Sequence, residues 1–156
     1  MTDRTTPPTT TDDAPQARLE RSGAHVQGDG YTGTLMERMG IDITEVSPDG
    51  ARGTMPVEGN VQPYGILHGG ASAVLAETLG SYAASVHAGD ERAAVGIELN
   101  CTHHRAARSG LVSGVARAIH RGNSVATYEI VIDDEAGKRI CTARLTCLIR
   151  PKPPAA

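Results

Sequence analysis

Hydrophobic and polar positions follow two periods along the chain, and the longer period marks a single long helix. After Gly59 a turn-rich loop leads into residues 68–89, where apolar side chains recur at the spacing of a helix with one buried stripe. The side chains expected in this stripe are Val74, Leu75, Leu79, Tyr82 and Val86. The rest of the chain is expected to fold around this helix.

Segments in which apolar and polar residues alternate lie on both sides of the helix and predict strands. A short helical turn is expected first, over residues 34–39. The strands are expected over residues 41–46, 51–57, 94–103, 111–120, 124–132 and 139–149. Because short turns join most of them, we expect a mostly antiparallel sheet with the helix on one face, an α+β domain of order β-β-α-β-β-β-β.

The third predicted strand places a histidine at the end of an apolar face. Strict alternation over residues 94–103 puts Val95, Ile97, Leu99, Cys101 and His103 on the same face of the sheet. His103 comes last, where the strand ends and the face meets a loop. It is therefore a candidate for contact with a substrate.

Length and local composition predict one domain with a tail at each end. The chain has 156 residues, enough for one real core. Residues 1–30 are rich in Thr, Pro, Asp and Gly, so a disordered tail is expected there, followed by a domain over residues 31–150. Residues 151–156 should form a short tail that cannot extend a sheet, since proline lacks the N–H of a strand ladder.

Composition and charge exclude several classes of function. Aromatic residues make up 3% of the chain, with no Trp or Phe, and the net charge is −3, so no nucleic-acid partner is expected. We find no signal sequence and no apolar run that would span a bilayer, which predicts a cytoplasmic protein without a membrane partner. The three cysteines, Cys101, Cys141 and Cys147, lack the spacing of a zinc site, so no metal is expected, and Cys141 and Cys147 should be core residues.

Beside the apolar stripe, the helix carries a row of small residues that contains one acid. Glu77 is the acid, and Ser81 lies one turn further along on the same side. The small residues of this row are Gly69, Gly70, Ala73, Ala76, Gly80, Ala83 and Ala84. A carboxylate among glycines and alanines suggests a site that a ligand or another backbone approaches closely.

The sequence around the start of this helix resembles a known family. It contains QPYGILHGGAS at residues 62–72, LAET at 75–78 and Ser81, followed by VGIELN at 95–100 with His103 and Arg105. With these intervals the chain from residue 35 to 149 resembles the hotdog-fold acyl-CoA thioesterases. It is most similar to the 1,4-dihydroxy-2-naphthoyl-CoA thioesterases of menaquinone biosynthesis, with the 4-hydroxybenzoyl-CoA thioesterases and the enterobactin-pathway proofreading thioesterases as close relatives.

The chemistry of thioester hydrolysis can be matched to residues of the helix. The reaction needs a base or nucleophile and hydrogen-bond donors for the carbonyl oxygen that gains charge. Glu77 is the candidate base or nucleophile, two roles that require the same residue type. Gly69 and Gly70 open the helix, where backbone N–H groups are unpaired and the dipole favours negative charge, so they can supply the oxyanion donor.

Helix geometry places these two functions too far apart for one helix to perform both. Glu77 lies eight residues beyond Gly69, roughly 12 Å along the axis. Two antiparallel helices from a pair of subunits can bring Gly69 of one chain to Glu77 of the other. The row of small residues would permit their close approach. The resemblance implies the same arrangement, a homodimer with sheets joined edge to edge that often pairs again into a homotetramer.

The resemblance also implies roles for residues around the thioester. Gln62 and His68 would border it, with His68 orienting the loop or donating towards the carbonyl. Ser81 would hold the carboxylate or the attacking water, and His103 would meet a substrate hydroxyl or the thioester. In the 4-hydroxybenzoyl-CoA branch the position of Ser81 is Thr and the His103 match is not retained, which favours the naphthoyl branch.

Coenzyme A is expected to bind at surface positions outside the helix, because its phosphates need cations and backbone donors. The positions that match the family are Arg105 and the run Gly122, Asn123 and Ser124, with Gly70 at the start of the helix. Arg108, Arg121 and Lys152 are weaker additions. Coenzyme A is then part of the substrate, and no bound cofactor is expected.

The sequence therefore predicts an acyl-CoA thioesterase that hydrolyses an aromatic or bulky acyl-CoA to the free acid and CoA. Two alternatives use the same scaffold. A hotdog-fold dehydratase or hydratase would pair a catalytic histidine with an acid and act on a hydroxyacyl group. A non-catalytic acyl-CoA-binding sensor would need an attached DNA-binding segment, and the tail before Gly30 lacks the basic helical pattern for one.

Overall fold

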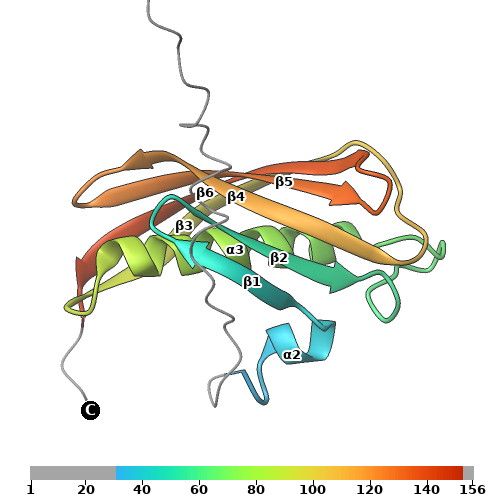
Figure 1. The fold of residues 1–156 in the computed structure, drawn as a ribbon, viewed down its shortest axis with the longest axis horizontal. Helices are drawn as coiled ribbons and strands as arrows, with labels where there is room; N and C mark the ends of the chain where they lie inside the picture. The colour runs from blue at the N-terminus through green and yellow to red at the C-terminus, as the bar shows by residue number, and fades with distance from the viewer. Residues whose placement is uncertain (1–30, 153–156) are drawn as a thin grey trace, which may run out of the picture.

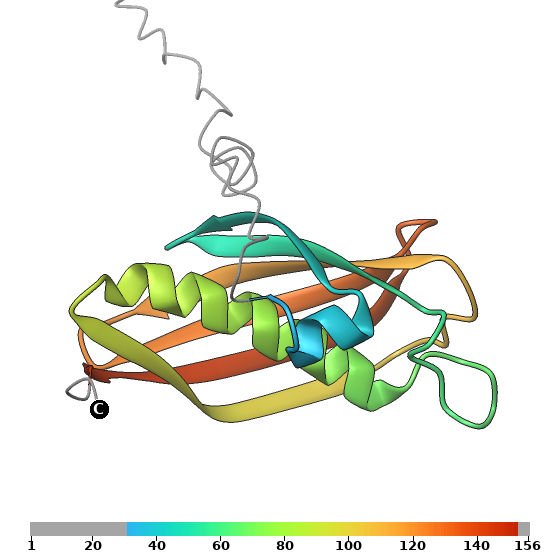
Figure 2. The same cartoon turned by 90° about the horizontal axis from the view of Figure 1, so that it is seen from below.

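A six-stranded antiparallel sheet wraps one face of a long helix (Figures 1 and 2). The structure, a computed structural model, describes residues 31–152, so the predicted tail over residues 1–30 and residues 153–156 lie outside the described residues. The elements are α2 (Leu35–Met39), β1 (Asp42–Ser47), β2 (Gly50–Pro56), α3 (Gly69–Ala88), β3 (Arg92–His103), β4 (Leu111–Arg121), β5 (Val125–Asp134) and β6 (Arg139–Pro151). The predicted order of strands and long helix is confirmed, as is the short helical turn.

The strand order across the sheet leaves β1 at one edge and β3 at the other. Spatially the strands run β1-β2-β4-β5-β6-β3, and every neighbouring pair is antiparallel. Figure 2 shows α3 lying across the sheet, with α2 over its N-terminal half and β3 along one edge. β3 has twelve residues, and within the described chain it pairs on one side only, with β6.

The face of α3 that packs on the sheet is made mostly of small residues, which differs from the predicted stripe. Leu75 and Leu79 are fully buried, but Val86 is 46% exposed. Most of the predicted row of small residues is buried instead, and a Cβ at Gly80 would lie 2.6 Å from Cδ2 of Leu145 on β6. The row therefore serves mainly to bring α3 close to its own sheet, because side chains from the strands fill the space.

A β-bulge in β3 overturns the predicted alternation of that strand. The register against β6 shifts between Gly96 and Glu98, so that Val95 pairs with Leu148 and Leu99 pairs with Leu145. Leu145 is buried under α3, whereas Val95 is 47% exposed. The strand thus changes face at the bulge: Val95 does not share the face of Leu99 as predicted, because the bulge inserts one extra residue.

The C-terminal strand runs two residues further than predicted. β6 ends at Pro151, which pairs with Arg92 of β3, so a proline does extend the sheet here. It can do so because the pairing with β5 goes no further than Leu148, so Pro151 has a partner strand on one side only, as at the edge of a sheet. No helix within residues 31–152 is both long and apolar enough to span a membrane.

Candidate active site

The first turn of α3 is built so that one backbone N–H remains available. His68 is the N-cap, and its Nδ1 accepts from the N–H of Gly70 at 2.8 Å. The carbonyl of His68 accepts from Ala71 at 2.9 Å and from Ser72 at 3.3 Å. Within residues 31–152 the N–H of Gly69 has no hydrogen-bond partner, as expected at the first helical position. Of the two predicted oxyanion donors, Gly69 and Gly70, only Gly69 therefore keeps a free N–H within the described residues, since His68 occupies the N–H of Gly70.

The loop before α3 is fixed by backbone hydrogen bonds at both of its ends. His68 N–H donates to Asn60 at 2.9 Å, and Leu67 N–H donates to Ala107 at 2.8 Å. The side-chain amide of Asn60 in turn donates to the carbonyls of Met39 and Pro56, at 2.8 and 2.9 Å. These contacts join the loop to α2, β2 and the segment before β4. The start of α3 is therefore held in one position without a substrate.

A pocket of about 400 Å³ opens at this end of α3 and contains four of the predicted site residues. His103 lies directly against Gly69, since a Cβ at Gly69 would come within 2.9 Å of Nε2 of His103. The absence of a side chain at Gly69 is thus required for this contact. We call it the Gly69 pocket, and its lining consists of Gln62, Ile66, Leu67, Gly69, Ser72, His103, His104, Arg105, Ala106 and Ile140.

The second group of predicted residues lies further along α3, around Glu77. Ser81 Oγ donates to Oε1 of Glu77 at 3.3 Å, as the spacing of one helical turn predicts. Glu77 lines a second pocket, of about 320 Å³. We call it the Glu77 pocket, and it is lined by Leu35, Met36, Ala73, Val74, Glu77, Thr78 and Leu99.

Two residues that shape these pockets were not predicted. Gly96 lies opposite Glu77, and a Cβ there would overlap Oε1 of the carboxylate. A single glycine inside a predicted strand was a usable signal, because it marks a bulge or a close approach of another group. Ser72 lines the Gly69 pocket and is only 3% exposed. It is part of the HGGAS run, but nothing in its spacing separates it from the neighbouring small residues.

The cysteines near the carboxylate are neutral core residues, as predicted for Cys141 and Cys147. Both are fully buried, and burial raises the pKa of Cys141 to about 12. Burial also raises the pKa of Cys147 to about 11, with a further contribution from the charge of Glu77 and an opposing one from a hydrogen bond with Ser81. A thiol with so high a pKa is no nucleophile at neutral pH.

Within one chain the donor and the carboxylate lie in separate pockets. α3 is unbroken from Gly69 to Ala88, so the predicted separation of roughly 12 Å between Gly69 and Glu77 is present. Glu77 does not line the Gly69 pocket, and Gly69 does not line the Glu77 pocket. A single thioester carbonyl cannot contact both groups of one chain.

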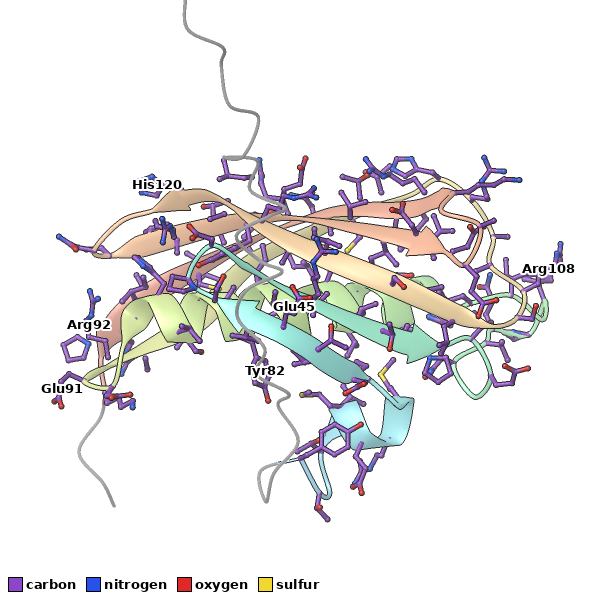
Figure 3. All side chains as sticks on the ribbon, in the orientation of Figure 1. Glu45, Tyr82, Glu91, Arg92, Arg108 and His120 are labelled. Atoms are coloured by element: carbon purple, nitrogen blue, oxygen red, sulfur yellow. The ribbon has the colours of Figure 1, made fainter. Side chains whose placement is uncertain are left out.

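The residues predicted to bind coenzyme A lie at opposite ends of α3. Arg105 lines the Gly69 pocket. The turn Gly122–Ser124 lies at the other end of α3, where the carbonyl of Gly122 is 3.0 Å from Nε2 of His87. The helix between them has 20 residues, about 30 Å. Figure 3 shows the same separation, with Arg108 at one end of the molecule and Arg92, which bonds the carbonyl of Asn123, at the other.

Among residues 31–152 no group of three or more His, Cys, Asp or Glu side chains could hold a metal ion. Histidines of the site do not pair with acids either, since each ion pair in this part of the chain joins an arginine to a carboxylate.

Comparison with known proteins supports the observed fold and the family that the sequence around the start of α3 resembles. The model of the thioesterase superfamily matches residues 64–141. The proofreading thioesterase EntH of Cronobacter turicensis is 48% identical over 118 residues, which cover 75% of this chain and 86% of that protein. The crystal structure of a Pseudomonas aeruginosa thioesterase variant has a TM-score of 0.75 at 38% identity, covering 79% of this chain and 90% of that one. A Haemophilus influenzae thioesterase has a TM-score of 0.74 at 36% identity, with coverage of 78% and 85%.

The similarity extends beyond the motif to most of the domain, and the proteins on which it rests are named thioesterases. The similarity establishes the class of reaction, which is hydrolysis of a thioester. The chain belongs to the thioesterase superfamily, has the hotdog fold and is a thioester hydrolase.

Proposed function

We propose that this protein hydrolyses an aromatic or bulky acyl-CoA, of the 1,4-dihydroxy-2-naphthoyl-CoA or hydroxybenzoyl-CoA type, in active sites shared between two copies of the chain. The observation that carries the proposal is the separation of the Gly69 pocket from the Glu77 pocket within one chain. Each pocket holds half of the groups that hydrolysis requires. A second copy supplies the missing half to each.

The edge strand β3 offers the surface on which two copies can join. An unpaired edge of twelve residues is a template for another strand, and β3 lies beside α3. Joining two β3 edges in antiparallel fashion places the two α3 helices antiparallel on the same face. If Gly69 of each chain faces Glu77 of the other, the two-fold axis passes Ala73, whose small side chain is only partly buried. We propose this homodimer, paired again into a homotetramer.

In this arrangement the thioester carbonyl lies between the two helices. The N–H of Gly69 stabilises the charge that develops on the carbonyl oxygen. The partner's Glu77 either attacks the carbonyl carbon, forming an anhydride that water then cleaves, or takes a proton from water as the water attacks. In both routes the C–S bond breaks, and the CoA sulfur leaves as thiolate and takes up a proton. His103 and Gln62 border the thioester from the side of Gly69.

The walls of the Glu77 pocket support an apolar or aromatic acyl group. Apart from Glu77 and Thr78 they consist of aliphatic side chains and Met36, from α2, α3 and β3. A site of this kind binds an apolar group mainly by removing it from water. The hydroxyl of Thr78 is available to a polar substituent. The similarity to a protein named as a proofreading thioesterase indicates a pathway other than menaquinone biosynthesis, so the acyl class is proposed here without that pathway.

The dimer would also unite the two halves of the predicted coenzyme A site. Gly89, next to the turn 122–124, lies twelve residues past Glu77. In the antiparallel pair that turn of the partner reaches about 18 Å beyond Gly69 along the helix axis. Arg105 lines the pocket at the same end. We propose that the pantetheine arm leaves along this path and that its phosphates lie between Arg105 and the partner's turn.

Replacing the carboxylate tests the proposed function. Glu77→Gln should lower kcat for release of free thiol from benzoyl-CoA and naphthoyl-CoA by about 1,000-fold or more, because the base or nucleophile is lost. Binding of desulfo-CoA and the oligomeric state should not change. Turnover within a few-fold of the unmodified enzyme would remove Glu77 from the mechanism.

Mixing two inactive variants tests the sharing of sites. Glu77→Ala and Gly69→Trp should each be inactive alone. After subunit exchange half of the dimers are hybrids, and each hybrid has one intact site, so about a quarter of the original activity should return. Exchange is verified with two affinity tags. Hybrids that form and stay inactive would show that each site belongs to one chain.

A further inference from the structure

Two side chains near the C-terminal end of α3 hold the turn between β4 and β5, residues 122–124. Nε2 of His87 donates to the carbonyl of Gly122 at 3.0 Å, and since a carbonyl can only accept, this nitrogen carries the proton. Nη1 of Arg92 donates to the carbonyl of Asn123 at 3.1 Å. Two neighbouring carbonyls of the turn are therefore directed towards the end of the helix.

Both side chains are themselves anchored at this end of α3. His87 lies in the last turn of the helix, where it is half-buried. Nε of Arg92 donates at 2.9 Å to the carbonyl of Ala88, the last residue of the helix. A cation at the C-terminus of a helix also interacts favourably with the helix dipole. Arg92 thus joins the helix end to the turn through one guanidinium group.

Because these carbonyls are held, two backbone N–H groups point away from α3. In a planar trans peptide unit the C=O and the N–H point in opposite directions. The N–H of Asn123 therefore points away from His87, and the N–H of Ser124 points away from Arg92. Within residues 31–152 neither N–H has a hydrogen-bond partner, and both Asn123 and Ser124 are exposed.

Two successive N–H groups on the surface form a small site for an anion. Other backbone groups of the turn are occupied, since the N–H of Gly122 donates to Val125 and the carbonyl of Ser124 accepts from Ile149, both at 2.8 Å. If a held carbonyl were released, its peptide unit could rotate and present a partial negative charge, which repels a phosphate. The direction of the two held carbonyls therefore determines whether the turn can accept a phosphate.

We infer that His87 and Arg92 are positioning residues for coenzyme A, because they hold the turn with its N–H groups free for a phosphate. The inference rests on the proposed function, which supplies the identity of the ligand. His87 lies ten residues beyond Glu77 on α3, about 15 Å along the axis, too far to act on the thioester beside that carboxylate. Its loss should therefore weaken binding of the CoA part and leave the chemical step intact.

Two replacements of His87, each measured with two thioesters, test the inference. His87→Leu removes the hydrogen bond to Gly122 and should raise KM for benzoyl-CoA about 5- to 10-fold with kcat within about two-fold. Hydrolysis of S-benzoyl-N-acetylcysteamine, which has the same acyl group and no phosphate, should not change. His87→Gln, whose side-chain amide can donate in place of Nε2, should restore the original KM. Val86→Ala, at a position that is 46% exposed, is the control for loss of a side chain on this turn of α3.

The short thioester separates failure of this inference from failure of the proposed function. An unchanged KM for benzoyl-CoA in His87→Leu would overturn the positioning role. An equal loss with both thioesters would overturn it too, because the variant would then disturb the whole enzyme. If the unmodified protein hydrolysed neither thioester, the proposed function would be wrong. The dissociation constant of desulfo-CoA, measured by calorimetry, tests the inference even then and should rise by the same factor in His87→Leu.

Arg92 needs a variant that keeps its charge, because any cation attracts a phosphate. Arg92→Lys keeps the charge but lacks the guanidinium fork that bonds the carbonyls of Ala88 and Asn123 together. It should raise KM for benzoyl-CoA as His87→Leu does and leave hydrolysis of the short thioester unchanged. An Arg92→Lys protein with the original KM would show that Arg92 acts by charge alone and does not position the turn.

Discussion

Gly96 of β3 and Glu77 of α3 lie so close together that a side chain at Gly96 would occupy the space of the carboxylate. The bulge next to Gly96 brings the strand to this position. Glu77 is thus held from two sides, by the bare backbone of β3 and by the hydroxyl of Ser81. The carboxylate has a defined direction before any substrate arrives, as catalysis requires.

Gly96→Ala is expected to displace the carboxylate while the fold persists. The added methyl group overlaps Oε1 of Glu77, and its contact with Leu145 at 3.5 Å is an ordinary one. Because a shift of 1 Å in a reacting group lowers rates strongly, kcat should fall about 10- to 100-fold. Urea unfolding and kcat/KM measured on the same preparation separate misplacement from unfolding. An unchanged kcat would show that the direction of Glu77 is not critical.

His68 is expected to act by capping α3. Its Nδ1 accepts from Gly70, so His68→Ala should lower the free energy of unfolding by about 1 kcal/mol. The kcat should fall as well, because the N–H of Gly69 loses its fixed direction. His68→Asn, which can also accept this hydrogen bond, should restore both. If His68→Asn restores stability and not kcat, the imidazole contacts the substrate directly.

Ser81 is expected to position Glu77 through its hydroxyl. Ser81→Ala removes the 3.3 Å hydrogen bond to Oε1 and should lower kcat about 10-fold with little change in KM. Ser81→Thr keeps the hydroxyl and should remain within a few-fold of the original kcat. Steady-state kinetics with one aromatic acyl-CoA gives kcat and KM for both variants. Equal losses in both variants would mean that packing at this position matters more than the hydrogen bond.

The parts of the structure that are local in sequence could be predicted. The helical period over residues 68–89 corresponds to α3, and the separation of Gly69 from Glu77 follows from the rise of a helix. The contact of Ser81 with Glu77 follows from the same geometry. Because these relations depend only on residues within a few turns, no knowledge of the sheet was required.

The parts that depend on neighbouring elements could not be predicted. Val86 is apolar yet 46% exposed, because it lies one turn after Tyr82 on the side of α3 away from the sheet (Figure 3). Gly80 is buried because Leu145 of β6 occupies the space beside it. The register shift beside Gly96 is a property of the pairing with β6, and the alternation of β3 alone does not reveal it, although the glycine itself was a signal. The same limit applies to the site, because the second chain that we propose to complete it leaves no pattern in the sequence.

The stability of the protein is expected to fall at alkaline pH because of its buried thiols. Burial raises the pKa of Cys141 to about 12 and that of Cys147 to about 11, from an ordinary value of 9.0. Between pH 9 and 11 the unfolded chain therefore loses thiol protons that the folded chain keeps. The unfolded state then binds fewer protons, so the free energy of unfolding must decrease as the pH rises. Below pH 9 both states are protonated and the thiols add no pH dependence.

Urea unfolding from pH 8 to 11 measures this effect, and a cysteine variant isolates it. Each thiol can contribute a slope of up to about 1.4 kcal/mol per pH unit in this range. Cys147→Ala should be less stable at pH 8, because it leaves a cavity, and should lose less stability between pH 9 and 11 than the unmodified protein. Burial also raises the pKa of Tyr128, from 10.0 to about 12, so this residue lowers the free energy of unfolding at alkaline pH in the same way. Part of the pH dependence must therefore remain in the Cys147→Ala variant. An identical slope in both proteins would mean that Cys147 ionises as readily when folded as when unfolded, and that water reaches the space behind Glu77.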